Sequence, residues 1–117
     1  MKSISQFDEI YLYKPFVDMR CQINGLSAIV EGAMQLSPDA NRLFVFTNKR
    51  KKILKLLYWN GSGFALWMTR LEKDVFKWPR ASAAIFPLNS RELGLLLDGI
   101  DISKQKPLEQ LSYSTFS

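Results

Sequence analysis

Carboxylates are the side chains of this sequence with the clearest potential for chemistry. The candidates are Asp18, Glu72, Asp98 and Asp101. Clustered carboxylates hold Mg²⁺ in two-metal phosphoryl-transfer enzymes. However, Asp98 and Asp101 are three apart at the end of a predicted helix, a spacing common in helices without a site. Asp18 is equally suited to cap a turn, and Glu72 to pair with a neighbouring cation. We interpret all four as structural and predict no catalytic residue, metal or cofactor.

The sequence lacks the residues on which many other enzyme classes depend. It contains no histidine and a single cysteine, Cys21. Most zinc ligands are Cys or His, and most general bases near neutral pH are His, so zinc enzymes, Ser-His-Asp hydrolases and Cys-His proteases are excluded. One cysteine cannot form an internal disulfide, and we interpret Cys21 as a small packing residue. Carboxylate chemistry or a non-enzymatic binding role remains.

The basic residues are concentrated in the middle of the chain. The formal net charge is −2 over residues 1–41, +8 over residues 42–80 and −1 over residues 81–117, which accounts for the total of +5. The central part contains the run Lys49-Arg50-Lys51-Lys52. A local cationic surface is typical of proteins that bind polyanions. The alternative is that a basic run at a strand turn only prevents aggregation.

Aromatic residues alternate with lysines in the same region. Trp59, Trp67 and Trp78 are near Lys55 and Lys77 in the predicted strands. We expect most of the aromatic side chains to pack in the core. The three tryptophans are the candidates for an exposed stacking surface or a partner interface.

Hydrophobic patterns predict the elements that position these residues. Strands are expected at residues 10–13, 43–47, 53–59, 64–71 and 75–78, a short edge strand at 84–88, and helices at 22–36 and from 90 to 97. Asn60-Gly61 predicts a hairpin with a type I′ turn. Asn89 or Ser90 is expected to cap the last helix, with Glu92 in its first turn and Gly99 beyond its end.

The predicted fold class is α+β. A four-stranded antiparallel meander at residues 43–78, with a helix before and a helix after, would form a two-layer single domain with both helices on one face. This domain is expected to span residues 1–102, followed by a polar tail at 103–117. Both faces of the sheet are largely apolar, so we expect the tail or a partner to cover the second face. No membrane span or signal peptide is predicted, and we expect a cytoplasmic protein.

Several segments resemble the small second-frame protein of the IS-sixty-six family of bacterial insertion sequences. They are Val17-Asp18-Met19-Arg20, Asn24-Gly25-Leu26, residues 43–46 and 55–61, Arg70-Leu71-Glu72, residues 76–79 and residues 96–101. Their order and spacing agree over about residues 10–102. The resemblance implies an Orf2-like, TnpB-type accessory protein of transposition, encoded beside a separate and larger DDE transposase.

The resemblance indicates further candidate phosphate-binding residues beside the basic run. The predicted nucleic-acid-binding residues are Lys49, Arg50, Lys51, Lys52, Lys55, Arg70, Lys77 and Arg20. Arginine offers phosphate a forked pair of donors and lysine a point charge. For Arg20 and Arg70, the alternative is an ion pair with Asp18 or Glu72.

Three functional hypotheses follow from these features. The leading hypothesis is a non-enzymatic transposition factor that contacts DNA without sequence specificity and associates with the transposase or other proteins of the element. The alternative is a protein-interaction subunit of the transposase complex that never contacts nucleic acid. A cryptic Mg²⁺-dependent nuclease is the third and weakest hypothesis.

Overall fold

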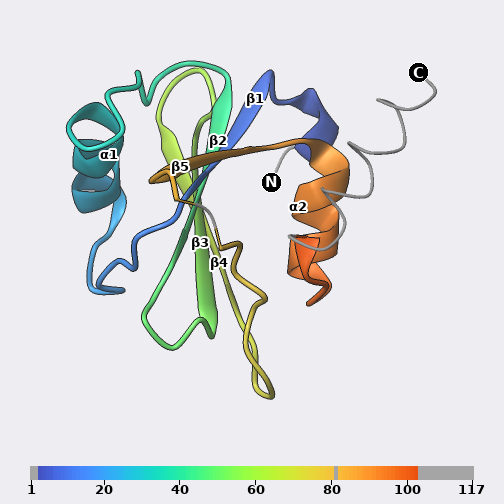
Figure 1. Ribbon diagram of the computed structural model, residues 1–117. Coiled ribbons are helices and arrows are strands. Elements are labelled where there is room, and N and C mark those ends of the chain that lie inside the picture. Colours follow the sequence, from blue (N-terminus) through green and yellow to red (C-terminus); the bar gives the residue numbers. More distant parts are fainter. Residues whose placement is uncertain (1–2, 81, 103–117) are drawn as a thin grey trace.

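The centre of the molecule is a five-stranded β-sheet with the strand order β4-β3-β2-β1-β5 (Figure 1). The computed structural model describes residues 3–80 and 82–102. The strands are β1 (Glu9–Tyr13), β2 (Arg42–Thr47), β3 (Ile53–Trp59), β4 (Phe64–Arg70) and β5 (Ile85–Leu88). The helices are the short 3-10 helix η1 (Ile4–Gln6), α1 (Ile23–Glu31) and α2 (Ser90–Leu97). The α+β class is confirmed, but the prediction of a four-stranded sheet is wrong.

β1 is an internal strand that runs parallel to β2. Tyr11 is opposite Phe44 of β2 on one side and opposite Pro87 of the antiparallel β5 on the other. Parallel neighbours need a crossover connection, and the chain between β1 and β2 contains α1. Only β2, β3 and β4 form an antiparallel meander.

Residues 75–78 do not form the predicted fourth strand of the meander. They follow a turn in which Asp74 has a φ of 62°. The Phe76 N–H donates to the carbonyl of Lys51 at 2.7 Å, so the segment is tied to the β2–β3 loop. Phe76 is buried in the core. The apolar pattern of this segment therefore reflects the anchoring of a loop in the core. Without a further strand beside it, β4 is one of the two edge strands of the sheet.

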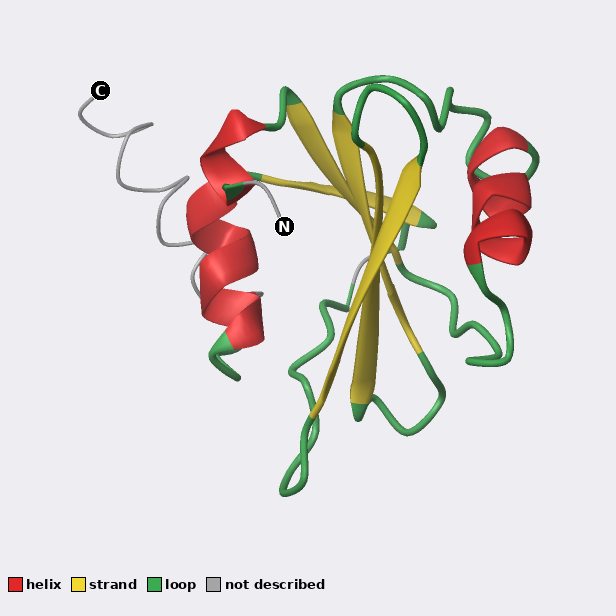
Figure 2. Ribbon diagram, turned by 180° about the vertical axis from the view of Figure 1, so that it is seen from behind, coloured by secondary structure: helices red, strands yellow, loops and turns green. Residues whose placement is uncertain are grey.

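The two helices lie on opposite faces of the sheet (Figure 2). Leu43 and Val45 of β2 point into the core on the α2 side, whereas Phe44 and Phe46 pack with α1 residues on the other side. A strand that is apolar on both faces must be covered on both. The expectation that both helices cover one face is wrong. The second face is covered by α2, together with η1-flanking residues and Phe76.

Helix α1 is shorter than predicted, because the chain leaves the helix after Glu31. Gln35 adopts a φ of 55°, and the Leu36 N–H donates to the carbonyl of Val30 at 2.9 Å. This turn places Met34 in the core beside Leu26 and Val30. The apolar spacing of the sequence therefore continues beyond the end of the helix.

The predicted hairpin is confirmed, with Trp59 opposite Phe64, but its turn is a four-residue loop. The Oδ1 atom of Asn60 accepts hydrogen bonds from the backbone N–H groups of Ser62 and Gly63. Gly61 has a φ of 101°, whereas Asn60 does not have the positive φ of a type I′ turn. The side chain of Asn60 thus organises the loop, as asparagine commonly does in Asx turns.

The predicted caps of α2 are confirmed. The Oδ1 atom of Asn89 accepts from the Glu92 N–H at 2.7 Å, and the Glu92 carboxylate accepts from the Asn89 N–H at 2.9 Å. Gly99, with a φ of 83°, ends the helix. The predicted tail, residues 103–117, lies outside the described residues. Within residues 3–80 and 82–102, no helix is long and apolar enough to cross a membrane.

Replacing Asn89 by Ala is expected to destabilise the domain, because the Glu92 N–H loses its acceptor at the first turn of α2. The expected decrease in the free energy of unfolding is about 1 kcal/mol, the usual cost of losing a helix N-cap. Urea unfolding followed by circular dichroism measures this decrease. An unchanged unfolding midpoint would show that the capping box does not stabilise α2.

Candidate nucleic-acid interface

Three loops meet at one end of the sheet. The strand register places the ends of β1, β2 and β4 and the start of β3 at the same end of the sheet. The pairs that show this are Leu12 with Val45, Thr47 with Leu54 and Ile53 with Arg70. We call the loops that follow these ends, residues 14–20, 48–52 and 70–80, the basic end. The 48–52 and 71–76 loops project from the lower end of the sheet in Figure 1.

The basic end contains most of the cations of the chain. Its basic residues are Lys14, Arg20, Lys49, Arg50, Lys51, Lys52, Arg70, Lys73, Lys77 and Arg80. Its acidic residues are Asp18, Glu72 and Asp74. The formal charge of +7 in these loops exceeds the +5 of the whole protein. Among the basic residues of the central stretch 42–80, all except Arg42 and Lys55 therefore lie in these loops.

The basic run is held as a fixed turn with its charged groups toward solvent. Lys49 and Arg50 are exposed, and Lys51 and Lys52 are partly exposed. The Oδ1 atom of Asn48 accepts from the Lys52 N–H at 3.1 Å, and the carbonyl of Lys52 accepts from the Leu71 N–H at 2.8 Å. In the part of the chain that the structure describes, no ion pair involves residues 49–52. The positive charge of the run is therefore not neutralised by an ion pair with any of the described residues.

Arg20 and Arg70, in contrast, form the ion pairs expected as their alternative role. The guanidinium of Arg20 binds the carboxylate of Asp18 at 2.6 Å, and that of Arg70 lies 3.8 Å from Glu72. The hydrogen bonds donated by the Arg20 side chain lower the pKa of Asp18 to about 2. Both pairs are exposed, so phosphate can compete for either arginine. Lys77 is exposed in the 70–80 loop.

Replacing Asp18 by Asn is expected to strengthen DNA binding several-fold if the basic end is the binding surface. The variant removes a negative charge beside the run and frees Arg20, while the amide Oδ1 can still accept from the Arg20 N–H. The salt dependence of log K should steepen by about one unit. Asp39→Asn, at the other end of the sheet, makes the same change in net charge and should have no effect. Equal affinities in the two variants would contradict this location.

Lys55, which was predicted as a nucleic-acid contact, is buried and does not belong to this surface. The residue is 3% exposed and lies on the α1 face of β3. Its Nζ donates to the carbonyls of Met19 and Cys21 at 2.8 and 2.7 Å. These bonds tie the loop before α1 to the sheet. The ammonium is therefore a structural group, satisfied by backbone acceptors.

The three tryptophans, predicted as a partner interface, do not lie together in the fold. Trp59 packs edge-on against Phe64 beside the hairpin loop, at the opposite end of the sheet from the basic run. Trp67 is 37% exposed in the edge strand β4. Trp78 lies in the basic end, where its indole N–H donates to the carbonyl of Lys14 at 2.9 Å. Trp78 is thus the one member of this set placed among the cations.

Sequence reasoning missed Phe16, which is 49% exposed in the 14–20 loop. It lines two hollows of the basic end. One, of about 470 Å³, also contains Lys14, Lys51 and Trp78. The other, of about 480 Å³, contains Lys49 and Arg50. The available signal was its position directly after Lys14-Pro15, where a proline ends a strand and places the next side chain in a loop.

The candidate carboxylates are not assembled into a metal site. Asp18 and Glu72 are engaged by arginines, and Asp98 follows α2. Among residues 3–80 and 82–102, no group of three acidic or cysteine side chains is placed to hold a metal ion.

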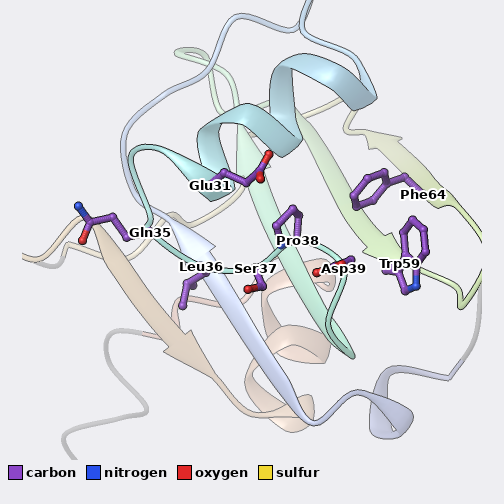
Figure 3. Close-up of a pocket in the computed structure, with 8 residues that line it drawn as sticks. All are labelled: Glu31, Gln35, Leu36, Ser37, Pro38, Asp39, Trp59 and Phe64. Atoms are coloured by element: carbon purple, nitrogen blue, oxygen red, sulfur yellow. The ribbon is translucent and has the colours of Figure 1, made fainter.

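The opposite end of the sheet contains a cleft of different character. It has a volume of about 610 Å³ (Figure 3). Trp59 and Phe64 form one wall, with their ring centroids 5.0 Å apart, and Pro38 and Asp39 lie across from them. Glu31 at the end of α1 adds a second carboxylate. None of the described lining residues is basic, so this cleft does not suit a polyanion.

Comparisons with known proteins place most of the chain in one family. Residues 8–107 match the family model described as IS66 Orf2 like protein. The chain is 32% identical over 92 residues to the uncharacterized protein y4hO and 35% identical over 96 residues to the uncharacterized protein y4jC, both of Sinorhizobium fredii (strain NBRC 101917 / NGR234). These alignments cover 79% and 80% of this chain and 80% and 82% of the relatives. No solved structure matches the chain. The family match contains every element from β1 to α2 and the entire basic end, and the chain belongs to the family of IS66 Orf2-like proteins.

Proposed function

We propose that this protein is a non-enzymatic accessory factor of insertion-sequence transposition that contacts the DNA backbone through its basic end. The family supports the link to the insertion sequence. The observation that carries the DNA contact is the run at residues 49–52, whose four cations project from a hydrogen-bonded turn without an ion-pair partner among the described residues. A protein with this role in a bacterium would act in the cytoplasm.

The expected binding mode is contact with phosphates and not readout of bases. Sequence-specific proteins commonly insert a helix into the major groove. Here α1 and α2 pack on the two faces of the sheet, and the basic end presents only loops. Cations on loops can follow a phosphate backbone without recognising base edges.

The protein partner is expected to be the co-encoded DDE transposase or another protein of the element. The cleft at the opposite end supports this second contact, because Trp59 and Phe64 offer an aromatic wall beside the carboxylates of Glu31 and Asp39. Such a site suits a basic side chain of a partner. This cleft also favours the alternative function, a subunit that binds only protein.

Titration of fluorescent duplex DNA with the full chain at two salt concentrations tests the proposal. Each phosphate contact contributes a slope of about −0.9 to log K against log salt, so four or more contacts should give a slope of about −4 or steeper. Competitor duplexes of unrelated sequence should bind equally well. Absence of binding at low salt, together with capture of the transposase that survives nuclease treatment, would support the alternative instead.

A further inference from the structure

We propose that the basic end binds single-stranded DNA in preference to duplex, with Phe16 as the platform on which an unpaired base stacks. This inference rests on the proposed function and names the form of DNA that the site takes. The juxtaposition behind it is an exposed aromatic ring placed between two groups of cations.

The exposure of Phe16 is not explained by the packing of the domain. About half of the residue is accessible, whereas its neighbour Val17 is buried in the core on the α1 side. The aromatic pairs found among the described residues do not include Phe16. An exposed phenyl ring costs free energy in water, and a ring with a free face among cations is the usual form of a base-stacking platform.

The loop that carries Phe16 is fixed on both sides. The Val17 N–H donates to the carbonyl of Thr47 at 2.8 Å, which ties the loop to the end of β2. On the other side, the Lys14 N–H donates to the carbonyl of Ala84 at 2.8 Å. The carbonyl of Lys14 also accepts from the indole N–H of Trp78. The ring is therefore presented on a rigid support, and little conformational entropy is lost when a base stacks on it.

The hollows on the two sides of Phe16 have the chemistry of a nucleotide site. The first, of about 470 Å³, combines Trp78 with Lys14 and Lys51, and lies within the roughly 300–1,000 Å³ range of small-molecule sites. The second, of about 480 Å³, is lined by Lys49 and Arg50. Its carboxylate, Asp18, is neutralised by Arg20. Each hollow thus joins an aromatic or apolar wall to cations that can bind the adjacent phosphates.

The ring distinguishes single strands from duplex. In a duplex the bases are stacked on one another, so a phenyl ring on a loop that contacts the backbone has no free base face on which to stack. An unpaired base has a free face, and base–aromatic stacking tolerates any sequence. Cations alone would favour the duplex, which has the higher charge density. Phe16 therefore adds affinity only for an unpaired strand.

The experiment compares a fluorescent oligo-dT with a duplex containing a strand of the same length, using the full chain and the variants Phe16→Ala and Phe16→Tyr. Phe16→Ala should weaken oligo-dT binding about tenfold, within the range known for loss of one stacking contact, and leave duplex binding within twofold. Phe16→Tyr should bind both like the native protein. Thermal unfolding checks that the variants are folded.

The outcomes separate this inference from the proposed function. Duplex binding that depends on residues 49–52, without a selective effect of Phe16→Ala on oligo-dT, overturns the stacking proposal and leaves the DNA contact intact. Equal losses for both ligands would also overturn it. If the native protein binds neither ligand at low salt, both proposals fail. Loss of transposase capture in Phe16→Ala with unchanged oligo-dT binding would assign the ring to a protein contact and overturn the stacking proposal.

Discussion

Replacing the four basic side chains of the 48–52 loop is expected to reduce duplex affinity at least about a hundredfold at about 0.1 M salt. The variant is Lys49→Ser, Arg50→Ser, Lys51→Asn and Lys52→Ser. Four lost phosphate contacts should also make the slope of log K against log salt shallower by about 3 to 4. Asparagine is chosen at position 51 because Lys51 has a φ of 58°, a conformation that asparagine tolerates.

The fold of this variant should remain intact. The turn is held by the Asn48 side chain and by backbone bonds from Leu71 and Phe76, none of which uses a removed side chain. Its melting temperature should therefore stay within a few degrees of the native value. A matched pair of single variants controls for net charge: Arg50→Ser lies in the run, and Arg91→Ser lies in α2. If both weaken binding equally, the effect is one of total charge and the run is not a contact surface.

The substitution Lys55→Met is expected to destabilise the domain without a direct effect on DNA contacts. Methionine keeps an unbranched apolar chain but leaves the carbonyls of Met19 and Cys21 without the ammonium donor. The cost of orphaned buried acceptors predicts a loss of about 2 kcal/mol in the free energy of unfolding. For a domain of this size, the melting temperature should fall by roughly 8 °C.

The control for this prediction is Lys49→Met, which removes an exposed ammonium from the neighbouring loop. Lys49→Met should leave the melting temperature unchanged and weaken DNA binding. Lys55→Met should lower the melting temperature and leave DNA binding unchanged when binding is measured well below that temperature. If the Lys55→Met protein has native stability, the two hydrogen bonds are not needed to hold the loop before α1 against the sheet. A stable variant with lost DNA affinity would restore Lys55 as a contact residue.

Features determined by neighbouring residues could be predicted from the sequence. The hairpin follows from Asn60-Gly61, and the start and end of α2 follow from Asn89, Glu92 and Gly99. The basic run was correctly predicted as a turn, because it separates two apolar strands. In each case the signal and the structure involve residues only a few positions apart.

Features determined by distant residues could not be predicted. The parallel pairing of β1 with β2 depends on contacts 33 positions apart. The positions of α1 and α2 on opposite faces likewise depend on packing with strands distant in the sequence. Lys55 alternates with Ile53 and Leu57 on an apolar face, a pattern that indicates burial, but its carbonyl partners lie in a loop more than 30 residues earlier. Pro15 indicates that Phe16 lies in a loop. Its position among the cations, however, depends on three loops that are distant in the sequence and meet at one end of the sheet.

The central claim is that DNA contacts the basic end and not another surface, and an NMR titration of the isotope-labelled full chain with short DNA tests it most directly. Backbone amide shifts should change in the loops at residues 14–20, 48–52 and 70–78 and decrease with added salt. The amides of residues 35–39 and 60–63, around the acidic cleft, should remain unchanged. Shift changes confined to the cleft, or no changes at low salt, would contradict the account.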